Sequence, residues 1–225
     1  MLLPQSFYTR EDVVQIAREL LGKYLFTRFD GELTGGIIIE TEAYAGITDR
    51  ASHAYADRRT ARTEVMYRRG GVAYVYLCYG IHSLFNIVTN DRDIPHAVLV
   101  RGIIPVIGKE VMQKRTGREI NGPGIGSGPG RVSKLLGIHF SHTGTDLTGD
   151  RIWLEDRGLY LPEKIITGTR IGVEYAMEDA LLPYRFRLGE HDIKKKRLPE
   201  FKGILFFFFP EKELISPCWR DQRQL

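Results

Sequence analysis

Two glutamates, a tyrosine and a histidine lie close together in the segment IIIETEAY and the residues after it. Glu40 and Glu42 are two residues apart, Tyr44 continues the spacing, and His53 follows Glu42 by eleven residues. Alternate residues of a strand share one face, so a strand would set both carboxylates beside the phenol. A carboxylate leaving an apolar strand can orient a water as a general base, which suits a hydrolase. On these residues alone, the alternative is that both glutamates pair with loop arginines.

A second group of reactive side chains lies in YVYLCYG, residues 74–80. Period-2 alternation predicts a strand with Tyr74, Tyr76 and Cys78 on one face. Tyr79 meets Gly80, whose tolerance of positive φ allows a sharp bend. We therefore expect the side chain of Tyr79 to point outward from the strand tip, and Tyr74 to belong to the core.

An arginine-rich segment with interleaved tyrosines separates these two groups. Its arginines are Arg50, Arg58, Arg59, Arg62, Arg68 and Arg69. Guanidinium groups bind phosphates and aromatic rings stack on bases, so the segment suits a nucleic acid. The alternative is a solvated loop whose arginines pair with nearby acids.

The elements that must position these residues follow from periodicity. Thr9 followed by Asp12 resembles a capping arrangement, and apolar residues then recur at helical spacing until Gly22, which predicts an amphipathic helix. A turn at Asp30-Gly31 joins two strands. Helices are predicted over 108–116 and 131–137, and strands over 24–29, 35–44, 72–79, 83–88, 97–101 and 151–155. This order predicts an α+β fold, a single domain with a mainly antiparallel curved sheet and peripheral helices.

A glycine-rich segment, NGPGIGSGPGR, precedes the second predicted helix after the strands. It lacks the Gly-Lys-Ser/Thr ending of a phosphate loop and the spacing of a dinucleotide site. We expect its glycines to let the backbone turn close to a ligand or to DNA.

Composition limits the class of protein. The chain has 225 residues, 43% of them hydrophobic, with a net charge of +4. It begins without a leader-like segment and has no apolar run long enough to cross a bilayer, so we expect an intracellular protein without a membrane partner. Its two cysteines form no CxxC motif or Cys/His cluster, so we expect no metal. A metallohydrolase built on Glu40, Glu42 and His53 would have too few ligands.

Several motifs occur in the order and spacing of one enzyme family. They are ETEAY at 40–44, SH at 52–53, YVYLCYG, FN at 85–86, AVLVR at 97–101, GPGRVSKLLGI and RIGVEYA. In these motifs the sequence resembles the alkyladenine DNA glycosylases, the 3-methyladenine glycosylase family. The likeness runs from about residue 5 to about residue 188. It implies a glycosylase domain over 1–190 and a divergent C-terminal tail, 191–225, that packs on the domain or extends from it.

The resemblance implies catalytic roles for three residues. Glu42 would activate the water that attacks C1′ of a flipped nucleotide. Arg101 and the backbone carbonyl of Ile171 would hold that water. The reaction passes through an oxocarbenium-like sugar, which a carboxylate stabilises without a metal or cofactor.

The resemblance also implies how a damaged purine is bound. Tyr44, His53 and Tyr76 would stack around the extruded base, and Asn86 would exclude the amino group of normal guanine. Tyr79 would intercalate in the minor groove and fill the gap left by the flipped nucleotide.

The implied partner is double-stranded DNA with damaged purines, bound by a monomer. The protein would be located in the cytoplasm or nucleoid of a prokaryote or in the nucleus of a eukaryote. The implied reaction removes 3-methyladenine, 7-methylguanine or hypoxanthine and leaves an abasic site. The alternative from another class is a non-catalytic nucleic-acid binding module that uses the same tyrosines for stacking.

Overall fold

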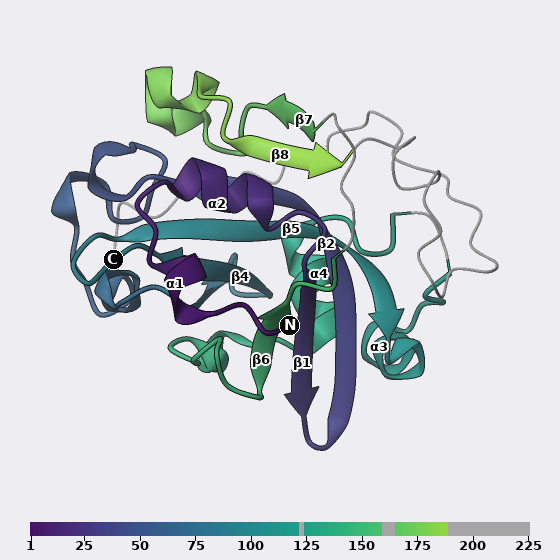
Figure 1. The fold of residues 1–225 in the computed structure, drawn as a ribbon. Coiled ribbons are helices and arrows are strands. Elements are labelled where there is room, and N and C mark those ends of the chain that lie inside the picture. The colour runs from purple at the N-terminus through teal and green to yellow at the C-terminus, as the bar shows by residue number, and fades with distance from the viewer. Residues whose placement is uncertain (122–123, 159–164, 189–225) are drawn as a thin grey trace.

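Strand β2 (Glu32–Tyr44) runs through the middle of the sheet in the computed structural model, which describes residues 1–121, 124–158 and 165–188 (Figure 1). The sheet has eight strands in the order β3-β4-β5-β2-β1-β6, and β8 pairs with β2 and β7. The other strands are β1 (Tyr24–Phe29), β3 (Ala73–Cys78), β4 (His82–Thr89), β5 (His96–Ile107), β6 (Ile152–Glu155), β7 (Ile165–Gly168) and β8 (Arg185–Leu188). The pairings in the described chain are antiparallel, which confirms the predicted α+β class.

The predicted turn between the first two strands is present. Asp30 and Gly31 both have positive φ, 53° and 79°, and the register pairs Phe29 with Glu32. Two consecutive positive φ values match the right-handed twist of the flanking strands. The Asp-Gly pair therefore sets the register of β1 against β2.

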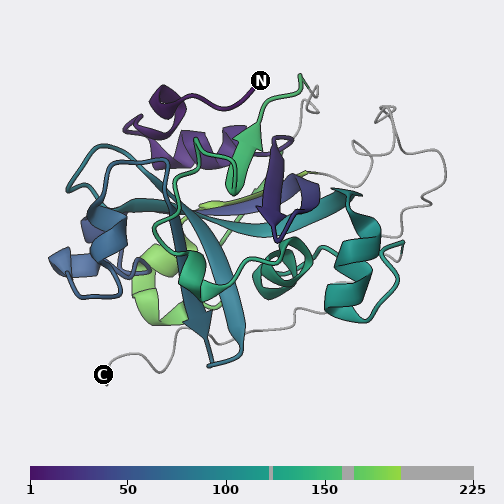
Figure 2. The same ribbon diagram turned by 90° about the horizontal axis from the view of Figure 1, so that it is seen from below.

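Helices cover the sheet from opposite sides. Helix α2 (Val13–Glu19) is the predicted amphipathic helix, but its cap is Asp12 and not Thr9, because the side chain of Asp12 accepts a hydrogen bond from the N–H of Gln15. The other α-helices are α1 (Gln5–Tyr8), α3 (Lys109–Thr116) and α4 (Pro129–Leu136), of which α1 was not predicted. Figure 2 shows α1 and α2 on one side of the long strands β2 and β5, with α3 and α4 on the other.

Short 3₁₀ segments fill the connections that the sequence left without structure. They are η1 (Gly46–Thr48), η2 (Tyr55–Asp57), η3 (Glu64–Tyr67), η4 (Phe140–His142) and η5 (Glu174–Leu181). A single 3₁₀ turn is too short to carry an apolar period, so sequence patterns do not reveal it. Segments η1 to η3 shape the arginine-rich segment between β2 and β3.

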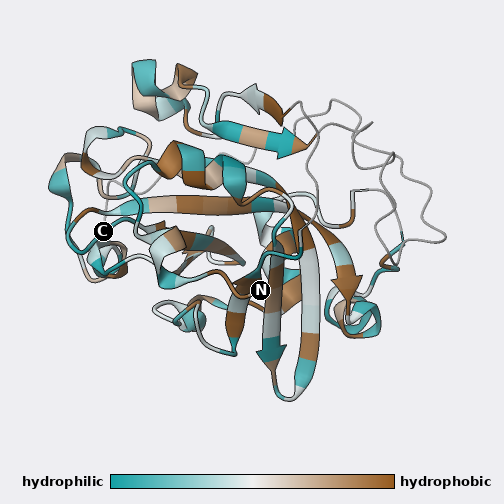
Figure 3. Ribbon diagram, in the orientation of Figure 1, coloured by the Kyte–Doolittle hydropathy of each residue, from teal (hydrophilic) through white to brown (hydrophobic). Residues whose placement is uncertain are grey.

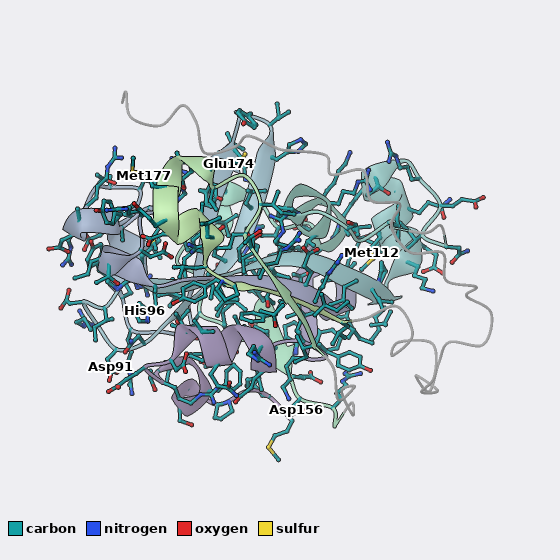
Figure 4. The ribbon with its side chains drawn as sticks, turned by 90° about the horizontal axis from the view of Figure 1, so that it is seen from above. Asp91, His96, Met112, Asp156, Glu174 and Met177 are labelled. Atoms are coloured by element: carbon teal, nitrogen blue, oxygen red, sulfur yellow. The ribbon has the colours of Figure 1, made fainter. Side chains whose placement is uncertain are left out.

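Two apolar clusters pack against the strands. The larger one contains Phe85, Ile87, Val98 and Val100 together with buried residues of α2 and α4. The second is rich in tyrosine and includes Tyr44, Tyr74, Tyr76, Leu84, Leu99, Val173 and Ala176. Figure 4 shows η5, marked by Glu174 and Met177, on the side of the long strands opposite α2. Figure 3 shows hydrophobic residues concentrated in the central strands.

The glycine-rich segment approaches the sheet backbone. A Cβ at Gly126 would lie 1.9 Å from the carbonyl oxygen of Ile103, and the N–H of Ile103 donates to the carbonyl of Gly126 at 3.0 Å. Ser127 forms a bridge with Gly102. Here the absence of a side chain lets the segment contact strand β5. The expectation that these glycines let the backbone turn close to a ligand or to DNA stays a prediction.

In the described ranges, no helix has both the length and the apolar content that a membrane span requires.

Candidate active site

One row of residues crosses the sheet and carries the centre of the site. Glu42 on β2 lies opposite Leu99 on β5, Leu99 opposite Asn86 on β4, and Asn86 opposite Tyr74 on β3. On its other edge Glu42 lies opposite Arg185 of β8. Directly opposed residues of an antiparallel sheet project from the same face. The register therefore brings a carboxylate, an amide and a phenol to one surface.

Glu42 is completely buried, and four donor contacts hold its carboxylate. Its Oε1 accepts a hydrogen bond from the N–H of Ile171 at 2.9 Å. Its Oε2 accepts one from the hydroxyl of Tyr44 at 2.8 Å. The guanidinium of Arg101 approaches at longer distances, 3.3 Å from Nε to Oε1 and 3.5 Å from Nη1 to Oε2. Each carboxylate oxygen thus has one short hydrogen bond and one long charged contact.

Ile171 contacts Glu42 through its backbone N–H, which donates to the carboxylate. The resemblance implied a role for another group of this residue, the carbonyl, which would hold the attacking water. An N–H donor stabilises the charged form of a carboxylate. The role of the carbonyl stays a prediction.

Arg101 joins both glutamates of the ETEAY motif. Its Nε lies 3.3 Å from Oε1 of Glu40, and Arg185 lies 3.5 Å from the same oxygen. Burial lowers the pKa of Arg101, but Glu42 and Glu40 more than offset this, so its pKa is raised overall. The glutamates do form ion pairs, but with arginines of neighbouring strands rather than with loop arginines.

Four aromatic side chains beside Glu42, those of Tyr44, His53, Tyr74 and Tyr76, belong to one group. The rings of His53 and Tyr76 meet edge to face with centroids 4.7 Å apart, and those of Tyr74 and Tyr76 lie 5.4 Å apart. Tyr44 and Tyr76 are 3% and 4% exposed. Tyr74, which we expected only in the core, also hydrogen-bonds His53 and so belongs to this group. Its shared strand face with Tyr76 was the sequence signal for this.

The hydrogen bonds of His53 define its tautomer. Nη2 of Arg62 lies 3.4 Å from Nε2 of His53, and a guanidinium can only donate, so Nε2 accepts. Nδ1 then carries the proton and donates to the Tyr74 hydroxyl at 2.7 Å. Burial, followed by the charges of Arg62 and Arg58, lowers the pKa of His53 well below its usual 6.5. The imidazole is therefore neutral at pH 7.

Desolvation keeps the phenols of this group neutral as well. Burial raises the pKa of Tyr74 to about 12, although Arg62 opposes the rise. Burial and the charge of Glu42 raise the pKa of Tyr44 well above its usual value. Burial is also the largest cause of the raised pKa of Tyr76. The group thus presents neutral rings beside an acidic side chain.

Asn86 is held rigidly between two strands. Its Nδ2 donates to the backbone carbonyls of Tyr74 at 3.1 Å and Leu84 at 3.2 Å, and the residue is 4% exposed. Both amide hydrogens are therefore used by the protein, which fixes the direction of the side-chain carbonyl.

Tyr79 lies apart from this group, at the tip of the β3–β4 hairpin. The N–H of Ile81 donates to the carbonyl of Cys78 at 3.1 Å, which closes the turn around Tyr79 and Gly80. Tyr79 has φ 50° and is 50% exposed, and Ile81 is 72% exposed. A positive φ is uncommon for a bulky residue. Figure 2 shows this hairpin projecting from the body of the domain.

Several arginines of the arginine-rich segment pair with acids, while its binding of a nucleic acid stays a prediction. Arg50 pairs with Glu178, Arg59 with Glu64 and Asp93, and Arg69 with Asp91. For these arginines the ion-pair interpretation is correct. Arg62 instead lies 4.9 Å from the centroid of the Tyr76 ring, beside His53.

Sequence reasoning missed a buried ion pair next to the site. Arg170 and Asp49 are 4% and 2% exposed and form a two-pronged contact through both guanidinium Nη atoms. Arg170 directly precedes Ile171 in RIGV, and Asp49 follows ETEAY by five residues. The only signal was the presence of these residues near recognised motifs.

A metal site does not arise from the residues described. Among them, no group of three or more His, Cys, Asp and Glu side chains is arranged to hold a metal ion.

Comparison with known proteins places the chain in a family. The model of the family described as methylpurine-DNA glycosylase (MPG) matches residues 6–192. A protein of Chlamydia felis is 44% identical over 200 residues, which cover 86% of this chain and 100% of the relative. A protein of Desulfitobacterium hafniense is 39% identical over 84% of this chain and 95% of its own length. One of Bacillus cereus is 38% identical over 88% and 100%.

The names of these three relatives assign them provisionally to the 3-methyladenine DNA glycosylases. The family match covers most of the chain, including both glutamates, the tyrosine strand and the RIGV motif. The chain therefore belongs to the methylpurine-DNA glycosylase family.

Proposed function

We propose that the protein is a monofunctional DNA-3-methyladenine glycosylase. It flips an alkylated or deaminated purine out of duplex DNA, hydrolyses the N-glycosidic bond and leaves an abasic site. The substrates are 3-methyladenine, 7-methylguanine and hypoxanthine. The observation that carries the proposal is the buried Glu42 carboxylate, held by Ile171 and Tyr44 beside a group of aromatic rings.

Glu42 is the general base for the attacking water. Its carboxylate has about four lone-pair positions, and two of them receive short hydrogen bonds. The oxygens keep the capacity to accept a proton from water, because the Arg101 contacts are at the long end of the hydrogen-bond range. As the water attacks C1′, the bond to the purine breaks, the base leaves with the bonding electrons and Glu42 takes the water proton.

Arg101 orients the water and balances the charge of Glu42. A charge buried without a partner is costly, so a buried carboxylate needs a cation beside it. The guanidinium lies within reach of both oxygens of Glu42 and is itself balanced by Glu40. The negative charge of Glu42 also stabilises the cationic sugar in the transition state.

The aromatic group receives the extruded base. Tyr44, Tyr76 and the neutral His53 supply electron-rich ring faces, which attract purines with a positive charge. Asn86 extends into the same row and excludes bases with an additional amino group. Together these side chains make the pocket selective for damaged purines.

Tyr79 enters the DNA from the hairpin tip. Its half-exposed ring, on a turn that projects from the sheet, fits the space left by a flipped nucleotide. Extrusion costs a few kcal/mol, which stacking of this ring and of the base in the pocket offsets. The partner is double-stranded DNA, and the protein acts on it as a monomer.

The test is excision from a defined duplex. Purified protein is incubated with DNA that carries one hypoxanthine or 3-methyladenine, in the presence of a chelator, and strand cleavage is measured with and without alkali. We expect cleavage only after alkali, because a monofunctional enzyme leaves the strand intact at the abasic site. Release in the chelator would also distinguish this reaction from that of a metallohydrolase.

The decisive variant is Glu42→Gln, matched by Glu110→Gln at an exposed glutamate of α3. Loss of a general base reduces the rate by about 10²–10⁴-fold, while binding of lesion DNA is retained. Glu110→Gln excises at the parent rate. Equal excision rates for Glu42→Gln and the parent would show that Glu42 is not the general base. Tight binding without any excision by the parent would favour the non-catalytic binding module.

A further inference from the structure

We propose that the buried ion pair of Asp49 and Arg170 is the positioning unit of the active site. It acts by holding the Ile171 N–H and the Tyr44 ring in place against Glu42. The inference rests on the proposed function, because it assigns a role to residues that do not themselves contact the reacting atoms.

Arg170 uses both terminal nitrogens of its guanidinium inside the protein. Its Nη1 donates to Oδ2 of Asp49 and to the carbonyl of Ala43, the latter at 2.9 Å. Its Nη2 donates to Oδ1 of Asp49 at 2.8 Å and to the carbonyl of Asp179 at 3.0 Å. A planar fork with a two-pronged carboxylate partner permits little rotation. Arg170 therefore ties the end of β2 to segment η5.

Asp49 completes the other half of this junction. Besides Arg170, its Oδ2 accepts from the N–H of Ala45 at 3.0 Å and its Oδ1 from the N–H of Ala51 at 3.0 Å. The carboxylate thereby closes the turn that follows ETEAY. The pair fixes three pieces of chain at one point: the residues after β2, the RIGV segment and η5.

Both short hydrogen bonds of Glu42 come from groups that contact or adjoin Arg170. The N–H that donates to Oε1 belongs to Ile171, the next residue in the chain. The hydroxyl that donates to Oε2 belongs to Tyr44, whose ring centroid lies 4.9 Å from the Arg170 guanidinium. Movement of Arg170 would therefore disturb both bonds at once, although Arg170 has no direct bond to the carboxylate in this arrangement.

Stability alone does not account for this pair. Burying two charges is costly, and apolar side chains of similar volume often stabilise a protein as well or better. Apolar side chains, however, could not bind the carbonyls of Ala43 and Asp179 or the two amides of the turn. The need to hold these backbone groups in place by hydrogen bonds explains why Asp49 and Arg170, rather than apolar residues, are buried here.

The test compares cleavage with binding in Asp49→Asn and Arg170→Lys. Asp49→Asn keeps the shape of the side chain but removes the charge, and Arg170→Lys keeps the charge but removes the planar fork. With protein in excess over lesion duplex, we expect the single-turnover rate constant for cleavage of the N-glycosidic bond to fall about tenfold or more in each variant. The dissociation constant for the duplex should change by less than about threefold.

Leu20→Ala is the matched control for destabilisation. Leu20 is fully buried in the larger cluster with α2, on the side of the sheet away from η5. Its truncation should lower the melting temperature while the folded protein cleaves at the parent rate. If Leu20→Ala and Asp49→Asn lose cleavage equally at equal loss of melting temperature, the pair is merely structural and the inference is overturned.

The remaining outcomes also decide between the two proposals. If Arg170→Lys cleaves at the parent rate, the positioning role is overturned. The proposed function still stands after that result if the parent is active and Glu42→Gln is inactive. If Asp49→Asn fails to fold, Arg170→Lys alone provides the test, because it retains a cation for Asp49. A parent that releases no damaged base overturns the proposed function and the inference with it.

Discussion

The N–H of Ile171 donates a 2.9 Å hydrogen bond to Oε1 of Glu42, across 129 residues of sequence. The bond joins the RIGV segment to the ETEAY strand and orients one oxygen of the carboxylate. The other oxygen is oriented by the hydroxyl of Tyr44, from the same strand as Glu42. The carboxylate is thus positioned once by a neighbour in the strand and once by a distant segment.

Tyr44→Phe separates the hydrogen bond of Tyr44 from its ring. The variant keeps the stacking surface but loses the donor to Oε2 of Glu42, and a hydrogen bond to a charged group contributes about 1.5–3 kcal/mol. We expect single-turnover excision to slow by about ten- to a hundredfold, with little change in lesion binding. Tyr67→Phe, which loses a 3.0 Å bond to Asp57, is the matched control and should excise normally. Equal rates for the parent and Tyr44→Phe would contradict the assigned contact.

Tyr79→Gly tests the hairpin tip by opposing effects on stability and activity. Glycine adopts the φ of 50° without strain, whereas a side chain in this region costs about 1–2 kcal/mol. We expect the melting temperature to be no lower than that of the parent. Excision from duplex DNA should nevertheless fall, because the ring that fills the gap is gone.

A single-stranded substrate provides the control for this variant. No partner strand has to be separated there, so Tyr79→Gly and the parent should differ much less than on the duplex. The same loss on both substrates would show that Tyr79 does not assist extrusion.

Cationic lesions should leave faster than neutral ones. Stacking on the phenol rings favours a positively charged purine, and a neutral base also requires protonation to become a good leaving group. We expect 3-methyladenine to be excised faster than hypoxanthine from the same sequence. Tyr76→Leu should reduce excision of the cationic lesion more, since a cation–π contact contributes about 0.5–2 kcal/mol. Equal rates for both lesions in the parent would contradict this prediction.

Acid should destabilise the protein through His53. Its pKa in the folded state lies below 6.5, because of burial and then the charges of Arg62 and Arg58. At a pH between the folded and unfolded pKa values, only the unfolded chain binds the proton. The stability that the neutral imidazole contributes is therefore complete above pH 6.5 and declines as the pH falls below it. We expect the free energy of unfolding in urea to be lower at about pH 5.5 than at about pH 7.5.

His53→Gln is the control for this pH dependence. The variant should flatten the decline, while His96 and His142, whose pKa values burial also lowers, account for part of what remains. An unchanged slope in His53→Gln would show that the imidazole titrates alike in both states.

Local patterns were sufficient to predict most of the regular elements. The apolar period of α2, the turn at Asp30 and Gly31 and the alternation of YVYLCYG each depend on residues close together in the chain. Such signals are read correctly because the backbone preferences that produce them are local. Helix α1, strands β7 and β8 and the 3₁₀ segments were not predicted, since they are too short to show a period.

The sequence by itself determined the α+β domain with its mainly antiparallel sheet and the types of side chain in the site, while the order of the strands came from the structure. Only the tertiary structure decided that Ile171 donates through its N–H, that Tyr74 bonds His53, and that Asp49 and Arg170 form a buried pair. These contacts join segments whose separation in sequence carries no periodic signal. They form because sheet register and burial bring the segments together, and a buried polar group must then find a partner.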